Sequence, residues 1–244
     1  MTMRKISIYL FLLIMLQSCS EGGFFKTGNP GTERRTIPGF TYVEIRDVFN
    51  VTLRHGENTG VVIKCGEALI PGIKTSLSND TLIISNENHF DWTRKYSRIE
   101  LIIETDSVEK ITLDEPCKMV TDGVFRQDKL IVWATNNLTE IDMEIETGHF
   151  YLVNSWINTG NYRLRGSTNY AYLVINGTAN LDASELMADD MYLEQKSVDD
   201  IHVNVDNYLT YSIMNSGSIF CYNNPANIEE SGNSGTGKLI IIDN

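Results

Sequence analysis

A repeat of roughly 18 to 22 residues runs through the second half of the chain, and it limits the fold more than any other feature of the sequence. Apolar segments recur once per repeat, at 130–133, 150–153, 171–174, 191–193 and 208–211. Alternating segments form a second set, at 141–145, 162–165, 179–183, 201–205 and 219–222. Most of the links between the two sets contain Gly, Asn, Ser or Thr, which are turn residues. Two strands per period predict a β-solenoid, whose coils must stack to bury their inner face.

The second set of segments separates an inner face from an outer face. In 141–145 the apolar residues occupy alternate positions, as a strand with one buried and one solvated face requires. The residues predicted to point inward across this set are Ile141, Met143, Ile145, Leu164, Leu181, Ala183, Ile201, Val203, Val205, Ile219 and Cys221. Charged outward residues on neighbouring coils would then form a ladder, with Arg163 or Arg165 between Glu144 and Asp182.

The rest of the chain is also predicted to be β-structure. Residues 37–115 have the pattern of N-terminal strands of the same domain, and the stacked coils are expected over 116–244. Turns are predicted at 55–58 and 77–82, and the best helix candidate is a single turn at 185–189. The predicted fold class is therefore all-β, a parallel β-helix-like solenoid with a strand-rich N-terminal part.

Residues 1–18 have the features of a signal peptide. A basic start is followed by an apolar run, Ile6 to Leu16, that is too short to span a bilayer. The segment Leu16-Gln17-Ser18-Cys19 resembles the lipobox of a bacterial lipoprotein precursor, which implies cleavage before Cys19 and its acylation. Several acyl chains would anchor the protein to a membrane. The alternative is a plain secretory signal or a short core helix with a chance cysteine.

The lipidated Cys19 would be joined to the fold by a tether. Residues 19–36 are rich in glycine and polar residues, which predicts a flexible segment. Similarity to lipoproteins of the Bacteroidetes group suggests sorting to the outer membrane and leaves display at the cell surface open.

Charge and cysteine spacing exclude several kinds of partner. The net charge of −12 argues against nucleic acid, which needs a basic surface. Cys65, Cys117 and Cys221 are far apart and lack C-x-x-C spacing, so no zinc site is expected. Cys65 and Cys221 are predicted to be small buried hydrophobes, and the sequence leaves open whether any two of the three pair. The four histidines are isolated, so no metal or cofactor is predicted.

The segment 86–97 interrupts the coil period with a group of aromatic residues, which includes Phe90, Trp92 and Tyr96. Two interpretations stay open for it. The segment folds back over an open end of the solenoid, or it is a binding loop whose exposed rings contact a ligand.

Other aromatic residues lie among the coils. Trp156 is beside a turn and Tyr222 is at an outward position, so both are candidate ligand contacts. Together with Tyr162, Tyr170 and Tyr172 they would form an aromatic face on which a glycan stacks. The alternative is that these rings cover coil edges. The ring of Trp133, within a coil strand, is predicted to be packed.

The order and spacing of several short motifs resemble those of the auto-transporter adhesin head (GIN) domain family of Bacteroidetes lipoproteins, over roughly residues 38–242. The matching segments are Phe40–Ile45, Asn50–Gly56, the turns at 158–160, 176–178 and 215–218, and the strands at 181–186, 201–205 and 219–225. The chain departs from the family pattern at Asn224, where glycine is usual, and in the glycine-free turn 196–200. The resemblance implies a right-handed β-helix-like stack and no known catalytic residues.

The sequence therefore predicts a non-enzymatic lipoprotein of the cell envelope that binds glycan or protein through one face of the solenoid. One alternative is a structural or regulatory module that binds another envelope protein. Another is a polysaccharide-cleaving β-helix enzyme, which would use a carboxylate pair or a bound calcium ion with a basic residue. The adjacent acidic pairs 189/190, 199/200 and 229/230 are candidates, but neighbours on a strand point to opposite faces. No catalytic residue is predicted.

Overall fold

The computed structural model describes residues 28–88, 99–155 and 157–242, and its regular structure is almost entirely β-strand. In these residues the helical structure is one short 3₁₀ turn, η1 (Ile70–Gly72). The predicted helical turn at 185–189 is wrong, because these residues lie inside a long strand. Leu186 and Ala188 alternate with exposed neighbours and are fully buried in the solenoid.

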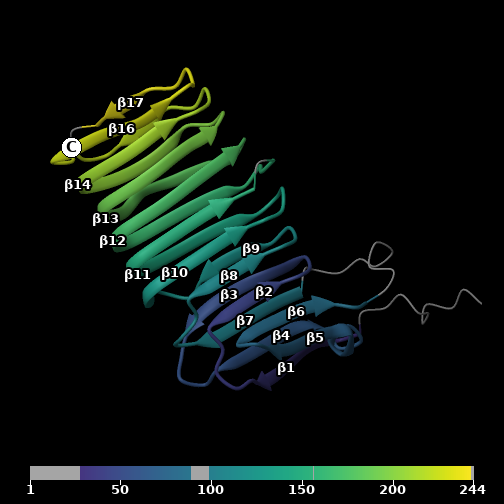
Figure 1. Ribbon diagram of the computed structural model, residues 1–244. Helices are drawn as coiled ribbons and strands as arrows, with labels where there is room; N and C mark the ends of the chain where they lie inside the picture. Colours follow the sequence, from purple (N-terminus) through teal and green to yellow (C-terminus); the bar gives the residue numbers. More distant parts are fainter. Residues whose placement is uncertain (1–27, 89–98, 156, 243–244) are drawn as a thin grey trace, which may run out of the picture.

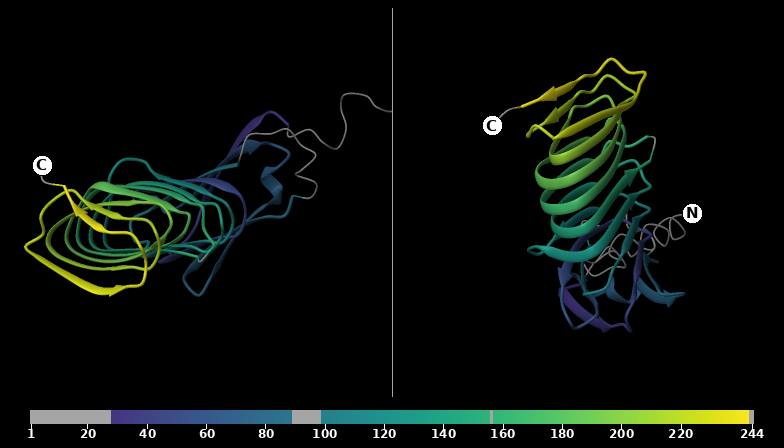
Figure 2. Two further views of the ribbon diagram at one scale, coloured as in Figure 1. Left: turned by 90° about the horizontal axis from the view of Figure 1, so that it is seen from above. Right: turned by 60° about the vertical axis from the view of Figure 1, so that its left-hand side comes forward.

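The solenoid of about seven turns confirms the predicted fold class. Its central coils are β10 (Phe125–Ala134), β11 (Glu140–Asn154), β12 (Asn161–Gly177), β13 (Asn180–Ser197) and β14 (Ile201–Ile213). Each of these strands pairs in parallel with the next, so the coils lie directly over one another (Figure 1). Seen end-on, the coils are flattened loops with two long sides (Figure 2).

In β11, β12, β13 and β14 the two predicted segments belong to a single bent strand. β11, for example, contains both 141–145 and 150–153. At the distal end, β15 (Ile219–Cys221) pairs with β14 and with β17 (Leu239–Ile241), and β16 (Asn227–Asn233) pairs with β14. The backbone ladder therefore continues along both long sides of the loop.

The N-terminal strands extend the same sheet. They are β1 (Pro30–Thr36), β2 (Tyr42–Ile45), β3 (Phe49–His55), β4 (Gly60–Gly66), β5 (Ile73–Ser78), β6 (Thr81–Asn86), β7 (Ile99–Thr105), β8 (Lys110–Leu113) and β9 (Lys118–Thr121). β2 and β3 pair in parallel with β8 and β9, which in turn pair with β10 and β11. The pairs β1–β4, β4–β7 and β5–β6 are antiparallel. The β5–β6 hairpin confirms the turn predicted at 77–82, where Asn79 and Asp80 have positive φ angles of 47° and 65°.

β1 corrects the extent of the predicted tether. Residues 30–36 were expected to be flexible, but they form seven register pairs with the edge of β4. The side chain of Arg35 also reaches into the neighbouring hairpin, where its Nη1 donates to the carbonyl of Ile73 at 2.7 Å. Backbone pairing and this bond hold the segment against the fold.

The interior is a continuous apolar column. All eleven residues predicted to point inward are at most 2% exposed, which confirms the alternation. Cys221 is buried there, whereas Cys65 is only half-buried, and both carry free thiols. Cys117 is buried, and its thiol lies 3.4 Å from the carbonyl oxygen of Asp47. No helix among the described residues is long and apolar enough to cross a membrane.

Two aromatic predictions are wrong. Trp133 is 43% exposed, because it occupies an outward position between two buried residues, and the ammonium of Lys110 lies 3.4 Å from its ring centroid. Tyr162 is fully buried instead of facing solvent. Its hydroxyl donates to Oδ1 of Asn158 at 2.8 Å, and the amide of Asn158 donates to the carbonyl of Asn136 at 2.6 Å. The turn that contains Asn158 thus supplies a hydrogen-bond acceptor for the hydroxyl of Tyr162, whose ring lies in the core.

We predict that Asn158→Ala lowers the free energy of unfolding by about 1–3 kcal/mol, because the buried hydroxyl of Tyr162 and the buried N–H of Gly160 both lose their acceptor, Oδ1 of Asn158. Tyr162→Phe should cost less, about 1 kcal/mol. Tyr162→Phe should add little when Asn158 is already alanine, since the bond it removes is already lost. Denaturant unfolding checks this. Fully additive costs would show that the two side chains act independently.

Candidate functional site

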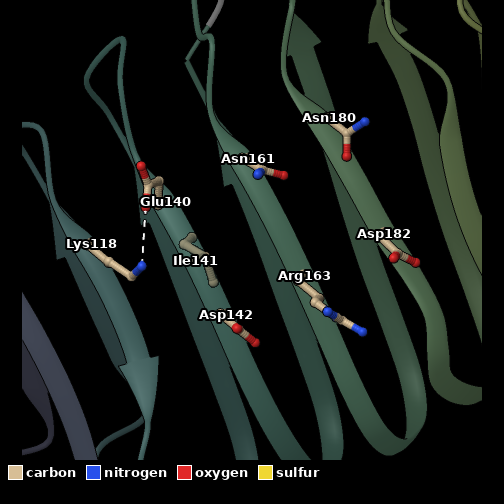
Figure 3. Close-up of a pocket in the computed structure, with 8 residues that line it drawn as sticks. All are labelled: Lys118, Glu140, Ile141, Asp142, Asn161, Arg163, Asn180 and Asp182. Atoms are coloured by element: carbon tan, nitrogen blue, oxygen red, sulfur yellow. Dashed lines mark ion pairs between the residues drawn. The ribbon is translucent and has the colours of Figure 1, made fainter.

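A groove with a volume of about 380 Å³ lies on one long side of the solenoid, and we call it the polar groove (Figure 3). It is formed by β9, β11, β12 and β13. The residues that line it are Lys118, Glu140, Ile141, Asp142, Asn161, Arg163, Asn180 and Asp182. Seven of the eight are polar or charged, so the groove suits a ligand rich in hydrogen-bonding groups.

The strand register arranges these side chains in two rows. Glu140 is paired with Asn161, and Asn161 with Asn180, which gives the first row. The second row continues from Asp142 to Arg163 and Asp182 in the same way. Paired residues on neighbouring strands are about 4.8 Å apart. Both rows therefore run along the solenoid axis, as the labelled side chains in Figure 3 show.

Ion pairs join the rows to their surroundings, but the pairing differs from the predicted ladder. Arg163 binds Glu185 at 3.0 Å, and Arg165 binds Asp142 diagonally at 2.8 Å. The register between β12 and β13 shifts after Arg163, which brings Glu185 opposite Arg165 and within reach of Arg163. These side chains are substantially exposed, so each pair contributes at most about 1 kcal/mol.

Asp182 is held in its ionised form. Burial alone would raise the pKa of its carboxyl group. Oδ1 of Asp182 accepts two hydrogen bonds from Ser184, one from the hydroxyl at 2.6 Å and one from the backbone N–H at 3.2 Å. His202 and Arg163 also lie near the carboxylate. Together these groups lower the pKa below its ordinary value. Asp182 is thus a fixed hydrogen-bond acceptor in the wall of the groove.

An aromatic cluster continues the second row beyond the groove. Asp182 is in register with His202, and His202 with Phe220. The rings of His202 and Phe220 are stacked, with centroids 5.0 Å apart and an interplanar angle of 12°. Nδ1 of His202 is 3.0 Å from the hydroxyl of Tyr222. Tyr222, a predicted contact residue, therefore lies on the same side as the polar groove.

The other long side of the solenoid carries most of the remaining rings. Tyr151, Tyr172 and Tyr192 follow one another in register on β11, β12 and β13. The rings of Tyr172 and Tyr192 are parallel to within 4°, and their centroids are 5.1 Å apart. The rings of Tyr170 and Tyr151 meet edge to face, with centroids 6.2 Å apart. Tyr170 and Tyr172 thus belong to a surface separate from Tyr222. Because the rings cover each other's faces, they present edges and hydroxyl groups to solvent.

Known proteins place this fold in a family. The sequence profile described as "Putative auto-transporter adhesin, head GIN domain" matches residues 39–225. The chain belongs to this family.

Several solved structures resemble this GIN-family chain. A putative adhesin from Bacteroides fragilis NCTC 9343 has a TM-score of 0.79 and 16% identity, over 88% of this chain and 97% of the other. A putative adhesin from Parabacteroides distasonis ATCC 8503 has a TM-score of 0.65 and 10% identity, over 88% and 98%. A putative lipid binding protein from the same organism has a TM-score of 0.63 and 13% identity, over 88% and 98%. At these identities the likeness concerns the fold alone. No functionally curated protein matches the chain.

The other candidate residues of this GIN-family chain lie outside the described residues. They are Cys19, Phe90, Trp92, Tyr96 and Trp156. Within 28–88, 99–155 and 157–242, no group of three or more His, Cys, Asp or Glu side chains could hold a metal ion. Sequence reasoning missed Asn161 and Asn180, although both occupy equivalent positions at the start of consecutive coils.

Proposed function

We propose that this chain is a non-enzymatic adhesion module of the cell envelope, which binds a glycan chain lying along the polar groove. The observation that carries the proposal is the pair of polar rows, which place two hydrogen-bonding side chains at equivalent positions on each of three successive coils. A glycan also repeats its hydroxyl groups along its length. A groove that runs along the solenoid axis would therefore contact several successive sugar units.

The side chains in the groove suit hydroxyl groups. Asn161 and Asn180 each offer a donor and an acceptor, Arg163 offers a planar set of donors, and Asp182 is an acceptor. Positive and negative groups alternate, so the groove has no strong charge of one sign. This composition favours a neutral or zwitterionic glycan over a polyanion.

The aromatic cluster extends this surface. Phe220 and Tyr222 are partly exposed and follow the groove in the direction of the stack. Aromatic rings present an apolar surface to the C–H face of a sugar, while a hydroxyl such as that of Tyr222 adds a polar contact. Polar rows followed by rings form one continuous strip for a linear ligand.

Binding explains the charged groups better than glycan cleavage does. In the groove, the pKa of Asp182 is lowered, so this carboxyl is not prepared to act as a general acid, and Glu140 forms an ion pair with Lys118. A carboxyl with a raised pKa occurs elsewhere, at Asp114, where burial is the main cause. Its neighbour Glu44 has a lowered pKa because it accepts a bond from Arg46. Asp114 also accepts a hydrogen bond from the Thr135 hydroxyl. Asp114 and Glu44 both lie outside the polar groove, so this carboxyl pair is not part of the proposed binding surface.

A glycan array probed with the full chain tests the proposal. We predict that neutral or zwitterionic oligosaccharides bind, and that Arg163→Ala and Phe220→Ala each weaken binding at least tenfold while changing the melting temperature little. Arg126→Ala is the matched control, because Arg126 forms a similar exposed ion pair, with Glu146, away from the polar groove. It should bind as the wild type does.

Two results would count against this function. Absence of any bound glycan would favour a protein ligand for this side of the solenoid. Equal loss of binding in Arg126→Ala and Arg163→Ala would show that the ligand responds to overall charge and not to the polar groove.

We also propose that acylation of Cys19 anchors the chain, and the family's description as an adhesin head supports a place in the cell envelope. Cys19→Ser should abolish the incorporation of labelled fatty acid into the protein, because no thiol is left to acylate. A variant that still incorporates the label would contradict the anchor. Ser18→Ala, which keeps the small residue before the cysteine, is the control.

A further inference from the structure

The side of the solenoid opposite the polar groove has a charge order that is complementary to itself. Seven residues follow one another in register on β8, β10, β11, β12, β13, β14 and β16: Lys110, Ile131, Tyr151, Tyr172, Tyr192, Thr210 and Glu229. Among these seven residues the first is a cation, the last a carboxylate, and tyrosines lie in the middle; beyond Lys110 the column continues to Tyr42 on β2. We call the outward side chains of these strands the tyrosine face.

The neighbouring column repeats this order. Lys129, His149, Tyr170, Asp190 and Tyr208 follow one another in register. Lys129 and His149 are exposed and Asp190 is partly exposed. In both columns the basic groups precede the central strand β12, and the acidic groups follow it. Along these two columns, basic side chains therefore lie toward the N-terminal strands and acidic side chains toward the C-terminal coils.

A two-fold axis that is parallel to the strands and passes over β12 maps each column onto itself with the order of the coils reversed. Tyr172 then faces Tyr172 of a second copy, and Tyr151 faces Tyr192. Lys110 meets Glu229, and His149 meets Asp190. An isologous interface requires this kind of self-complementary patch.

We propose that the tyrosine face binds a second copy of this chain in antiparallel, face-to-face orientation. Tyrosines are common in the centres of interfaces, because they bury a large rigid ring and keep a hydroxyl for polar contacts. The self-stacked rings present such edges and hydroxyls. Glu194 would face the apolar side chain of Val153 across the interface. The charge of Glu194 is balanced within its own copy, since its carboxylate forms an ion pair with Lys196.

The size of the tyrosine face suits a stable pair. Seven strands spaced by about 4.8 Å, which contribute on average about six residues with a rise of about 3.3 Å, cover roughly 670 Å² per copy. Specific complexes commonly bury about 800 Å² per partner. Figure 2 shows the two long sides of the flattened coil. The residues of the polar groove belong to the other long side, so the groove stays open in this pair.

The antiparallel arrangement has a consequence for adhesion. The N-terminal strands lie at one end of the stack and β16 and β17 at the other (Figure 1). The two N-terminal ends of the pair therefore point in opposite directions. With the anchor proposed at Cys19, on which this step alone depends, the two copies would be held by two apposed membranes, and the tyrosine face would join them.

Sedimentation velocity of the full chain in density-matched detergent tests the pairing. We expect a concentration-dependent dimer, which Lys110→Glu or Glu229→Lys weakens at least tenfold by opposing like charges. An equal mixture of the two variants should restore it, because each altered residue then faces its complement. Lys118→Glu, a charge reversal in the polar groove, is the control and should leave the dimer unchanged. Melting curves show whether each variant is folded.

Cross-linking gives a second measurement that does not depend on charge reversal. Tyr170→Cys lies close to the two-fold axis, so a short bis-maleimide should link two copies through it. Asn161→Cys, in the polar groove, should give no link above the wild-type background. A chain that is monomeric at all concentrations, a dimer indifferent to the charge reversals, or a mixture that fails to restore pairing would overturn the proposal. None of these results depends on glycan binding.

Discussion

Parallel backbone pairing between successive coils is the interaction on which the rest of the structure depends. Each coil alone would leave its inner side chains in water, and only the next coil covers them. Residues such as Leu164, Leu181 and Val203 are fully buried for this reason. Once this interior column sets the register, most outward residues also acquire a neighbour at the equivalent position on the next coil. The surface of the molecule is therefore ordered by the same constraint as its core.

This order gives the two long sides different chemistry. On one side, equivalent positions hold amide, carboxylate and guanidinium groups, which form the polar groove. On the other side, they hold tyrosines flanked by basic groups at one end and acidic groups at the other. A ligand that repeats along its length suits the first surface. A second copy of the chain suits the second, so one module would provide both binding and self-association.

The sequence was sufficient to predict the solenoid, because alternation such as Ile201, Val203 and Val205 leaves only one face for the core. It was insufficient where the outcome depends on contacts across coils. The burial of Tyr162 requires Asn158 to reach its hydroxyl, and Trp133 lies at an outward position where the ammonium of Lys110, on the neighbouring strand, covers its ring. The polar groove was missed because its rows exist only once the register is known. A shift within one strand pair was enough to change the partner of Arg163.

The register of the coils is thus the central claim, and disulfide formation between neighbouring coils measures it directly. Glu140 and Asn161 are register partners, so their Cα atoms lie at a separation that a disulfide spans. A chain with cysteine at both positions should oxidise almost completely, whereas cysteines at 140 and 163, two residues out of register, should stay reduced. Efficient oxidation of the second pair in place of the first would contradict the coil register, and with it both proposed surfaces.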